Sequence, residues 1–216
     1  MKLSNSCVIL GGGGHARMLI EILTIREIPI VGILDKNQEL WGQTNQGVSV
    51  LGGDERLPEI KDQVKWFAIG LGGVGNNLPR QKLFEYALSQ GLDPITIIHP
   101  TAIVSEWARL GRGCQLLPGS IINAGSVLGD NVIINSGAIV EHDCQIGSHV
   151  HVATGARLAS TVSIGTGTHI GIGATVRQCI KIGDYALVAA GAVVVKDVAP
   201  RVVVTGVPAR VQRKIE

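Results

Sequence analysis

The chain has 216 residues and a formal net charge of +2. This length allows one large or two small domains with a buried core, and so small a charge argues against a nucleic-acid or membrane-surface partner. No apolar run approaches the roughly 18 residues of a membrane span, and the N-terminal apolar stretch is too short for a signal peptide. We therefore expect a cytoplasmic protein with no membrane span.

The composition is unusual in two respects. Glycine occurs 29 times, whereas aromatic residues make up only 3% of the chain. A core with so few rings must be filled by aliphatic side chains, which suggests a narrow and regular interior. The four cysteines, Cys7, Cys114, Cys144 and Cys179, lie far apart with no Cys-x-x-Cys pair, so buried or idle thiols in a reducing compartment are expected.

The first half of the chain alternates between predicted strands and helices. Short apolar runs predict strands at 7–10, 30–35 and 64–70, and apolar residues at helical spacing predict helices at 15–25 and 78–91. This alternation favours a parallel sheet with crossover helices. We expect a Rossmann-like α/β domain over residues 1–95.

The first predicted strand runs directly into glycines, in the sequence CVILGGGGHA. Gly11, Gly13 and Ala16 form a G-x-G-x-x-A pattern at a predicted helix start, and Asp35 ends the next strand. Backbone N–H groups at a helix N-terminus can bind a diphosphate. The pattern therefore predicts a nucleotide diphosphate, carried by a nucleotide sugar or by a dinucleotide. A redox role is weakly supported, since no hydride-acceptor site is apparent.

From about residue 98 the period changes to six. An aliphatic residue recurs seventeen times in succession at Ile98, Val104, Leu110, Leu116, Ile122, Leu128, Ile134, Val140, Ile146, Val152, Leu158, Ile164, Ile170, Val176, Ile182, Val188 and Val194. Neither a helix nor a lone strand has this period. A second small or apolar residue follows many of these by four positions, and the pair Leu110-Gly111 recurs every eighteen residues as far as Ile182-Gly183.

Six residues per strand and turn, with three such units per coil, describe a triangular solenoid. Its coils stack about 4.8 Å apart and bury a shared core. This is the hexapeptide-repeat pattern of an all-β left-handed parallel β-helix, which we expect over residues 96–216, including a short C-terminal tail. Proteins of this type usually form homotrimers with sites in the clefts between subunits, so a homotrimer is expected by analogy.

The stretch VEHDCQIGSHVHVATG, residues 140–155, carries three histidines. The hexad register places His142, His149 and His151 away from the prism axis, so that none is expected to be a core residue. Three interpretations remain open. The first is a zinc site, in which these histidines and His169 bind the metal as in a β-helical carbonic anhydrase. The second is a general base, His142, which is followed by Asp143. The third is a solvated polar turn.

Several motifs together resemble one enzyme family. They are the glycines before His15, Asp35, FAIG, IHPTAIVS, the hexapeptide run, N-x6-HD and a GVPA tail. The chain resembles the bacterial sugar acyltransferases of the left-handed β-helix class over nearly its whole length. The nucleotide-linked 4-amino-sugar N-acetyltransferases of the bacillosamine and perosamine pathways are most similar, and the sialic acid O-acetyltransferases are relatives.

This resemblance implies transfer of an acetyl group from acetyl-CoA to the 4-amine of a UDP- or GDP-linked amino-deoxy sugar, without a metal. His142 would be the general base and Asp143 its orienting acid. The substrate-binding residues implied are Gly12, Gly13, Gly14, His15, Asp35, Lys36, Gly70 and Asn135. The coenzyme-binding residues implied are His151, Ser160, Ile172, Gly173 and Ala190, with the Ser160 backbone N–H facing the thioester oxygen.

Two departures from the family pattern concern the nucleotide. The loop after FAIG, residues 71–77, is about five residues longer than usual and is expected near the nucleotide, and Lys36 stands where some members have a second acid. The choice between uracil and guanine therefore stays open. Cys144 occupies an inward hexad position and is expected in the core rather than as an acyl-carrying nucleophile.

Two further functions remain as alternatives. One is O-acetylation of sialic acid or another sugar hydroxyl, for which the nucleotide pocket would be redundant. The other is a non-catalytic structural or sugar-binding trimer, in which replacement of His142 by alanine would change nothing.

Overall fold

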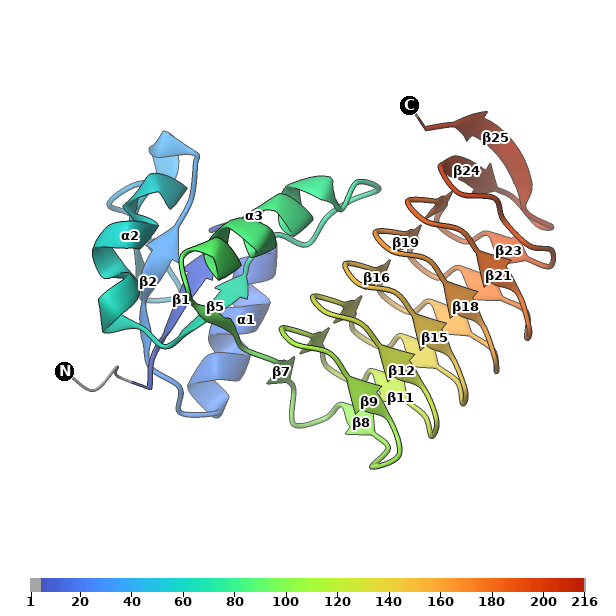
Figure 1. Cartoon of the computed structure of the whole chain (residues 1–216), viewed down its shortest axis with the longest axis horizontal. Helices are drawn as coiled ribbons and strands as arrows, with labels where there is room; N and C mark the ends of the chain where they lie inside the picture. The colour runs from blue at the N-terminus through green and yellow to red at the C-terminus, as the bar shows by residue number, and fades with distance from the viewer. Residues whose placement is uncertain (1–4, 216) are drawn as a thin grey trace. The chain divides into compact units, whose positions relative to one another are not determined.

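A computed structural model describes residues 5–215 of the chain (Figure 1). The described residues form two compact units. The first comprises the residues up to 72 together with 79–97, and the second comprises 73–78 together with the residues from 98 onward. The short segment 73–78 thus belongs to the second unit, although it interrupts the first in sequence.

The first unit is built on a six-stranded sheet with the order β3-β4-β2-β1-β5-β6. Only β3 runs antiparallel to its neighbour, and the other pairs are parallel. The strands are β1 (Cys7–Leu10), β2 (Ile30–Leu34), β3 (Thr44–Asn45), β4 (Val48–Gly52), β5 (Trp66–Ile69) and β6 (Asp93–Pro94). The strand order reverses at β1, so ligands of such a sheet bind at the carboxyl ends of its central strands.

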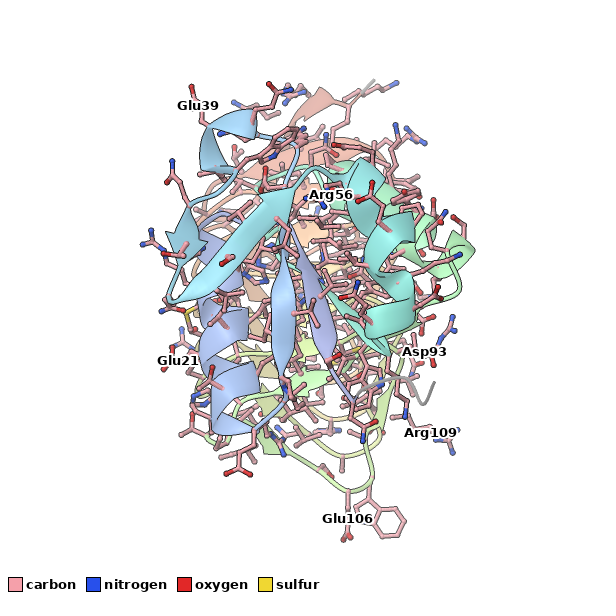
Figure 2. All side chains as sticks on the ribbon, turned by 90° about the vertical axis from the view of Figure 1, so that its left-hand side faces the viewer. Glu21, Glu39, Arg56, Asp93, Glu106 and Arg109 are labelled. Carbon is pink, nitrogen blue, oxygen red and sulfur yellow. The ribbon has the colours of Figure 1, made fainter. Side chains whose placement is uncertain are left out.

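Three α-helices accompany this sheet, namely α1 (Gly14–Ile25), α2 (Leu57–Ile60) and α3 (Leu78–Ser89). Short 3-10 turns occur at η1 (Gln38–Leu40), η2 (Asp54–Arg56) and η3 (Lys61–Gln63). Val8 and Leu10 of β1 share a core cluster with α2 and α3, through residues such as Phe84. Cys7 and Ile9 alternate with them and are fully buried outside that cluster. On α1 and in η1, Glu21 and Glu39 lie on the outside of this unit (Figure 2).

The predicted strands and helices of this unit are all present, each within two residues of its predicted bounds. Gly91 follows α3 with φ +83°, as expected for a glycine that ends a helix. The segment 36–63 was given no prediction, and it contains β3, β4, α2 and the three 3-10 turns. Most of these elements have two to four residues and are too short for a periodic pattern, whereas β4 has five residues, as many as β2, and was not predicted.

The second unit is a left-handed parallel β-helix, as its period of six predicts (Figure 1). Its two-residue strands stack into three faces. Face A contains β7 (Ile97–Ile98), β10 (Gln115–Leu116), β13 (Ile133–Ile134), β16 (His151–Val152), β19 (His169–Ile170) and β22 (Leu187–Val188). Face B contains β8 (Ile103–Val104), β11 (Ile121–Ile122), β14 (Ile139–Val140), β17 (Arg157–Leu158), β20 (Thr175–Val176) and β23 (Val193–Val194). Face C contains β9 (Arg109–Leu110), β12 (Val127–Leu128), β15 (Gln145–Ile146), β18 (Ser163–Ile164) and β21 (Lys181–Ile182).

The register of this unit follows the sequence period without a slip. Each of the strands β7 to β23 ends on one of the aliphatic residues that recur at every sixth position. From Leu116 to Val194 these residues are all buried in one continuous core. The small residues four positions later, such as Ala138 and Cys144, fill the same core at the turns. Successive coils pair in parallel at intervals of eighteen residues, for example His151 with His169.

The three corners of the prism each contain a residue with positive φ. We name them the AB, BC and CA corners after the faces that they join. At the AB corner this residue is always glycine: Gly119, Gly137, Gly155, Gly173 and Gly191. The BC corner has Gly125, Asp143, Thr161 and Cys179, and the CA corner has Gly113, Asn131, His149, Gly167 and Tyr185.

The C-terminal end of this unit closes with β24 (Val202–Thr205), which extends face A, and β25 (Arg210–Lys214), which pairs antiparallel to β24. Val202 and Val204 cover the end of the core. Among residues 5–215, no helix has the length and apolarity that a membrane span requires.

Candidate functional site

The glycine loop of the first unit lies between the ends of β1 and α1. Gly11 has φ +101°, a conformation that favours glycine, and its N–H donates to the carbonyl of Leu34. The helix begins at Gly14 after Gly13, which makes no side-chain cap. A side chain at Gly13 or Gly14 would meet no atom within 4 Å. The helix N-terminus is therefore open to a ligand and suited to an anion.

Asp35 shapes this loop through both of its carboxylate oxygens. Oδ2 accepts a hydrogen bond from the N–H of Gly12 at 2.5 Å, and Oδ1 accepts one from the N–H of Asn37 at 2.7 Å. The Asn45 amide donates to the carbonyl of Gly12 at 2.8 Å, and the Trp41 indole donates to the carbonyl of Asp35 at 2.7 Å. The sequence analysis indicated Asp35, but it missed Asn45 and Trp41.

A second acid, Asp54, lies near Asp35 and was not indicated by the sequence analysis. Burial raises the pKa of Asp54, and the negative charges of Asp35 and Glu55 raise it further, while Lys36 opposes them. Its location in η2 depends on the tertiary fold, so no local pattern could have revealed it. Lys36 is exposed, and its positive charge partly offsets the increase in the pKa of Asp54.

The remaining predicted pocket residues lie around the same loop. The Cα of Gly70 is so close to the carbonyl oxygen of Gly11 that no side chain would fit there. A side chain at Gly12 would touch Ile33 and Asp35, at 3.3 and 3.4 Å. One at Gly72 would touch the His15 side chain at 3.4 Å. The structure therefore brings the predicted residues of the first unit together around the start of α1.

His142 and Asp143 form a pair at the BC corner of the β-helix. Nδ1 of His142 lies 2.9 Å from Oδ2 of Asp143, and the two side chains are 56% and 63% exposed. With the carboxylate at Nδ1, this ring nitrogen is the proton donor of the pair, which leaves the Nε2 lone pair available. A hydrogen bond between two exposed side chains adds little stability, so the arrangement suits proton transfer rather than folding.

The local backbone explains how this pair is positioned. Asp143 has φ +60°, and its N–H donates to the carbonyl of Ala124 one coil earlier at 3.0 Å. Its Oδ1 lies where a side chain at Gly125 would be. The glycine therefore leaves space for the carboxylate, and any larger residue at position 125 would displace it.

Ser160 lies one coil beyond His142 at the same corner. The N–H of Thr161 donates to the carbonyl of His142 at 3.0 Å, which holds the two coils in register. The backbone N–H of Ser160 donates no hydrogen bond to residues 5–215. This group is therefore available to an external oxygen near His142.

Asn135 and His151 form a second pair, which lies away from the BC corner. Nδ2 of Asn135 is 3.1 Å from Nε2 of His151, and Oδ1 of Asn135 accepts from the N–H of Ser136 at 2.8 Å. Nδ1 of His151 is 3.0 Å from the carbonyl oxygen of Gly73. Asn135 is at the AB corner and His151 is on face A.

The histidines other than His142 are more buried than the hexad register suggests. His149, His151 and His169 are 9%, 5% and 8% exposed. The hexad register, which placed these histidines away from the prism axis, did not predict this burial. They point away from the prism axis, but neighbouring residues cover them, and burial lowers the pKa of His169 to about 4. His149 contacts Asn131 at 3.0 Å.

Three of the residues expected along the coenzyme, Ile172, Gly173 and Ala190, lie at the AB corner, whereas His151 is on face A and Ser160 is at the BC corner. The N–H of Gly191 donates to the carbonyl of Ile172, and Gly173 donates to Thr154 one coil earlier. Ile172 and Ala190 are therefore stacked. The side chain of Ile172 is 62% exposed, so most of its apolar surface is not packed against the rest of the unit. An exposed aliphatic side chain in this row is suited to contact an apolar ligand segment.

The predicted residues of the β-helix therefore fall into two groups. His142, Asp143 and Ser160 lie at the BC corner, whereas Asn135, Ile172, Gly173 and Ala190 lie at the AB corner. Face B separates these two corners in every coil. One copy of this unit does not bring the two groups into contact.

Acyl transfer through the Cys144 thiol finds little support in this geometry. Cys144 is fully buried, its pKa is raised by burial, and its Sγ donates to the carbonyl of Ala159 at 3.3 Å. Its predicted place in the core is confirmed. In the part of the chain from residue 5 to 215, no three side chains of His, Cys, Asp or Glu are grouped to hold a metal ion.

Two known sequence families match the two units. Residues 6–87 match the family described as the PglD N-terminal domain, and residues 125–160 match the bacterial transferase hexapeptide family. A curated relative, UDP-N-acetylbacillosamine N-acetyltransferase of Bacillus subtilis, is 36% identical over 111 residues. That match covers 50% of this chain and 50% of the relative, so it extends over only half of its length.

Solved structures match over almost the whole chain. PerB from Caulobacter crescentus, solved with CoA and GDP-perosamine, is 38% identical, with a TM-score of 0.91 over 97% of this chain and 98% of that one. The acetyltransferase domain of PglB from Neisseria gonorrhoeae, solved with acetyl coenzyme A, is 32% identical, with a TM-score of 0.87 over 96% of this chain and 98% of that one. Structures of the Caulobacter enzyme are also known in which a histidine is replaced by asparagine or alanine.

Proposed function

The chain belongs to the family of left-handed β-helix sugar N-acetyltransferases that includes PerB and the PglB acetyltransferase domain, and we propose that it transfers the acetyl group of acetyl-CoA to the 4-amino group of a nucleotide-linked amino-deoxy sugar. The observation that carries this proposal is the exposed His142–Asp143 pair. It lies on a chain that also has an open glycine loop at a helix N-terminus.

His142 is the general base of the proposed reaction. Asp143 holds the proton on Nδ1, so that Nε2 presents its lone pair to the attacking amine. The amine nitrogen forms a bond to the thioester carbonyl carbon, Nε2 takes the proton from that nitrogen, and the C–S bond then breaks. The departing thiolate takes the proton from Nε2, so that CoA leaves as the thiol and His142 returns to its neutral form. The carboxylate also stabilises the imidazolium that forms.

The thioester oxygen acquires negative charge during this attack. The backbone N–H of Ser160, which has no acceptor among residues 5–215 and lies one coil from His142, is the donor that we assign to it. No covalent enzyme intermediate is needed. The location of Cys144 in the core, with a raised pKa, supports direct attack over acyl transfer through its thiol.

The first unit binds the nucleotide in this proposal. A side chain at Gly13 or Gly14 would meet no atom within 4 Å, so the start of α1 has room for a ligand, and its N–H groups are suited to a diphosphate. Asp35 fixes the loop through Gly12 and Asn37, so its main role is to hold the backbone donors in place. Lys36, which is exposed nearby, is suited to a phosphate or to the polar edge of a base.

The pantetheine arm of the coenzyme runs along the AB corner in this proposal. Ile172 and Ala190 are stacked there on successive coils, and Ile172 offers an exposed aliphatic surface. Glycine at every positive-φ position of this corner keeps it free of large side chains at those positions. A narrow, flat corner is suited to an extended chain.

We further propose that the protein acts as a homotrimer. Four of the six outward residues of face B are aliphatic, namely Ile103, Ile121, Ile139 and Val193, and the other two are Arg157 and Thr175. On face C only Val127 is aliphatic, and the other outward residues are Arg109, Gln145, Ser163 and Lys181. Arg109 on face C is exposed to solvent (Figure 2). Ile103 is 62% exposed in the single chain. Burying face B against another copy would bring the AB corner of one copy to the BC corner of another.

The test is a CoA-release assay with purified protein, acetyl-CoA and a panel of acceptors. The panel contains UDP- and GDP-linked 4-amino-6-deoxy sugars and free sialic acid, which represents the O-acetylation alternative. Replacing His142 with alanine should lower kcat by roughly 10²- to 10⁴-fold without changing the melting temperature. Equal rates for wild type and His142→Ala would exclude His142 as the base, and activity with sialic acid alone would favour O-acetylation.

The shared site has its own test, in which two inactive variants are mixed. His142→Ala removes the base at the BC corner, and Asn135→Ala alters the AB corner. Subunits are unfolded and refolded together, so that trimers form at random. If each site uses one corner from each of two subunits, about a quarter of the wild-type activity should return. No recovery in verified mixed trimers would show that each chain supplies a complete site.

A further inference from the structure

The long loop after β5 contacts the β-helix at three points. The carbonyl of Gly73 lies 3.0 Å from Nδ1 of His151 on face A. The Asn77 side chain donates to the carbonyls of Gly167 and Thr168, at 3.2 and 3.1 Å. A side chain at Gly75 would come within 2.7 Å of Leu187. The loop therefore lies along face A and spans several coils.

The loop is held against the β-helix by hydrogen bonds from Asn77. Asn77 is 3% exposed, so its two hydrogen bonds to the β-helix are shielded from water. Gly73 and Gly75 have φ values of +70° and +73°, which favour glycine. Asn76 accepts a hydrogen bond from the N–H of Leu78 at 3.0 Å, which closes the loop where α3 begins.

The contacts of His151 determine its tautomer. Because a carbonyl oxygen can only accept, Nδ1 must carry the hydrogen that is donated to Gly73. Nε2 is then an acceptor, and Nδ2 of Asn135 is the donor that it meets at 3.1 Å. The orientation of the Asn135 amide agrees, since its Oδ1 already accepts from Ser136. All of these hydrogen bonds are consistent with one arrangement.

We propose that residues 73–78 form a clamp that holds His151 in the tautomer with hydrogen on Nδ1, and that the clamp thereby makes Asn135 present a hydrogen-bond donor to the substrate. Both ring nitrogens of His151 are engaged within the chain, and the ring is 5% exposed. His151 is thus a positioning residue that acts through Asn135. This inference rests on the proposed acetyl transfer for its kinetic consequence, but not for the tautomer itself.

The remaining N–H of the Asn135 amide is the group that the clamp directs. It has no acceptor among residues 5–215, and a sugar hydroxyl or the thioester oxygen is an acceptor of the right kind. If His151 carried its hydrogen on Nε2 instead, two donors would face each other. The Asn135 amide would then have to turn, which would break its bond to Ser136 and replace the outward donor with an acceptor.

The neighbouring ring supports this requirement for a neutral His151. His169 pairs with His151 along face A, with ring centroids 4.9 Å apart at an interplanar angle of 83°. His169 is 8% exposed, and burial keeps it neutral at pH 7. A neutral, edge-on neighbour stabilises no positive charge on His151, and an uncharged ring is needed if Nε2 is to accept from Asn135.

The tautomer is measured by NMR on protein labelled with nitrogen-15 in its histidines, with His151→Gln used to assign the signals. Wild type should show hydrogen on Nδ1 of His151. Asn77→Ala removes both bonds to the β-helix, and Gly75→Ala displaces the loop at Leu187. Each variant should convert a measurable fraction of His151 to the other tautomer or to rapid exchange. Val74→Ser is the matched control, because Val74 is 96% exposed, and it should behave as wild type.

The kinetic consequence is tested on the same variants. Asn77→Ala and Gly75→Ala should each lower kcat about tenfold, the effect of losing one hydrogen bond worth about 1.4 kcal/mol. Hydrogen on Nε2 of His151 in wild type, or an unchanged tautomer in both loop variants, would overturn the clamp. If the tautomer changes as expected but no acceptor is acetylated, the clamp stands and the proposed function fails.

Discussion

The AB and BC corners of the same prism differ in the residue type at the position with positive φ. Every positive-φ residue at the AB corner is glycine, whereas three of the four at the BC corner are Asp143, Thr161 and Cys179. A side chain in this conformation costs roughly 1–2 kcal/mol, less for Asp. The two corners have the same geometry, so folding alone does not explain the difference. The BC corner carries His142, whose ring meets Asp143 and whose carbonyl accepts a hydrogen bond from the N–H of Thr161 one coil later.

The strongest test of this comparison makes the BC corner resemble the AB corner. Asp143→Gly should relieve backbone strain and raise the free energy of unfolding slightly. The same change removes the carboxylate from Nδ1 of His142, so we expect kcat to fall by about 10²-fold, the lower end of what a positioned general base contributes. The measurements are steady-state kinetics and urea unfolding on the same preparation. Asp143→Asn is the matched control, because asparagine tolerates the positive φ. Full activity in Asp143→Gly would contradict the role given to the carboxylate.

The converse change gives the AB corner a feature of the BC corner. Gly137→Val places a β-branched residue at φ +66°, where its Cβ would meet no atom within 4 Å. The cost is therefore backbone strain alone, which we expect to destabilise each chain by about 2 kcal/mol. Thr161→Val is the control, since position 161 already holds a β-branched residue at φ +61°. Equal losses in the two variants would show that the corners do not differ in strain.

The pH of these measurements matters because protonation of His169 on face A also changes the free energy of unfolding. His169 has a pKa of about 4 in the folded chain, below its usual 6.5. Between these values the unfolded chain binds a proton that the folded chain does not. Stability should therefore fall as the pH is lowered from 6.5 to 4, by about 1.4 kcal/mol per pH unit for each chain. His169→Phe should remove this part of the slope. A slope unchanged by the substitution would show that His169 titrates normally, and corner variants are best compared above pH 7.

Much of the prism could be predicted from the sequence because each coil repeats one local rule. The aliphatic residue at every sixth position predicted where each strand from β7 to β23 ends. The small residue four positions later predicted that Cys144 lies in the core. The pairing of His142 with Asp143 was equally accessible, because the two residues are adjacent. Local repetition makes the register insensitive to distant contacts.

The parts that escaped prediction depend on contacts between distant segments. His151 is buried and has a fixed tautomer because Gly73, 78 residues away, lies against it. Asp54 approaches Asp35 only through the fold of the first unit. Residues 71–77 were expected near the nucleotide; within this loop Gly72 lies beside His15, and the contacts of Gly73 and Asn77 with the β-helix were not predicted. No hydrophobic period records such contacts.

The smallest expected effect isolates strain from chemistry at the BC corner. Thr161 is exposed, has φ +61°, and makes its contact with His142 through its backbone N–H, at 3.0 Å from the carbonyl oxygen. Thr161→Gly keeps that hydrogen bond and removes the strained side chain. We expect each chain to gain about 1 kcal/mol of stability, reduced somewhat by the greater freedom of glycine in the unfolded chain.

Activity in Thr161→Gly decides what the threonine does. An unchanged kcat with raised stability would mean that the BC corner tolerates strain at position 161 without using it, so that only Asp143 links strain to function. A lowered kcat would mean that the side chain helps to hold the coil that carries the Ser160 N–H. A loss of stability would contradict the corner comparison itself, because it would show that threonine at this position is not strained. Thermal unfolding above pH 7 and CoA release on one protein sample distinguish these outcomes.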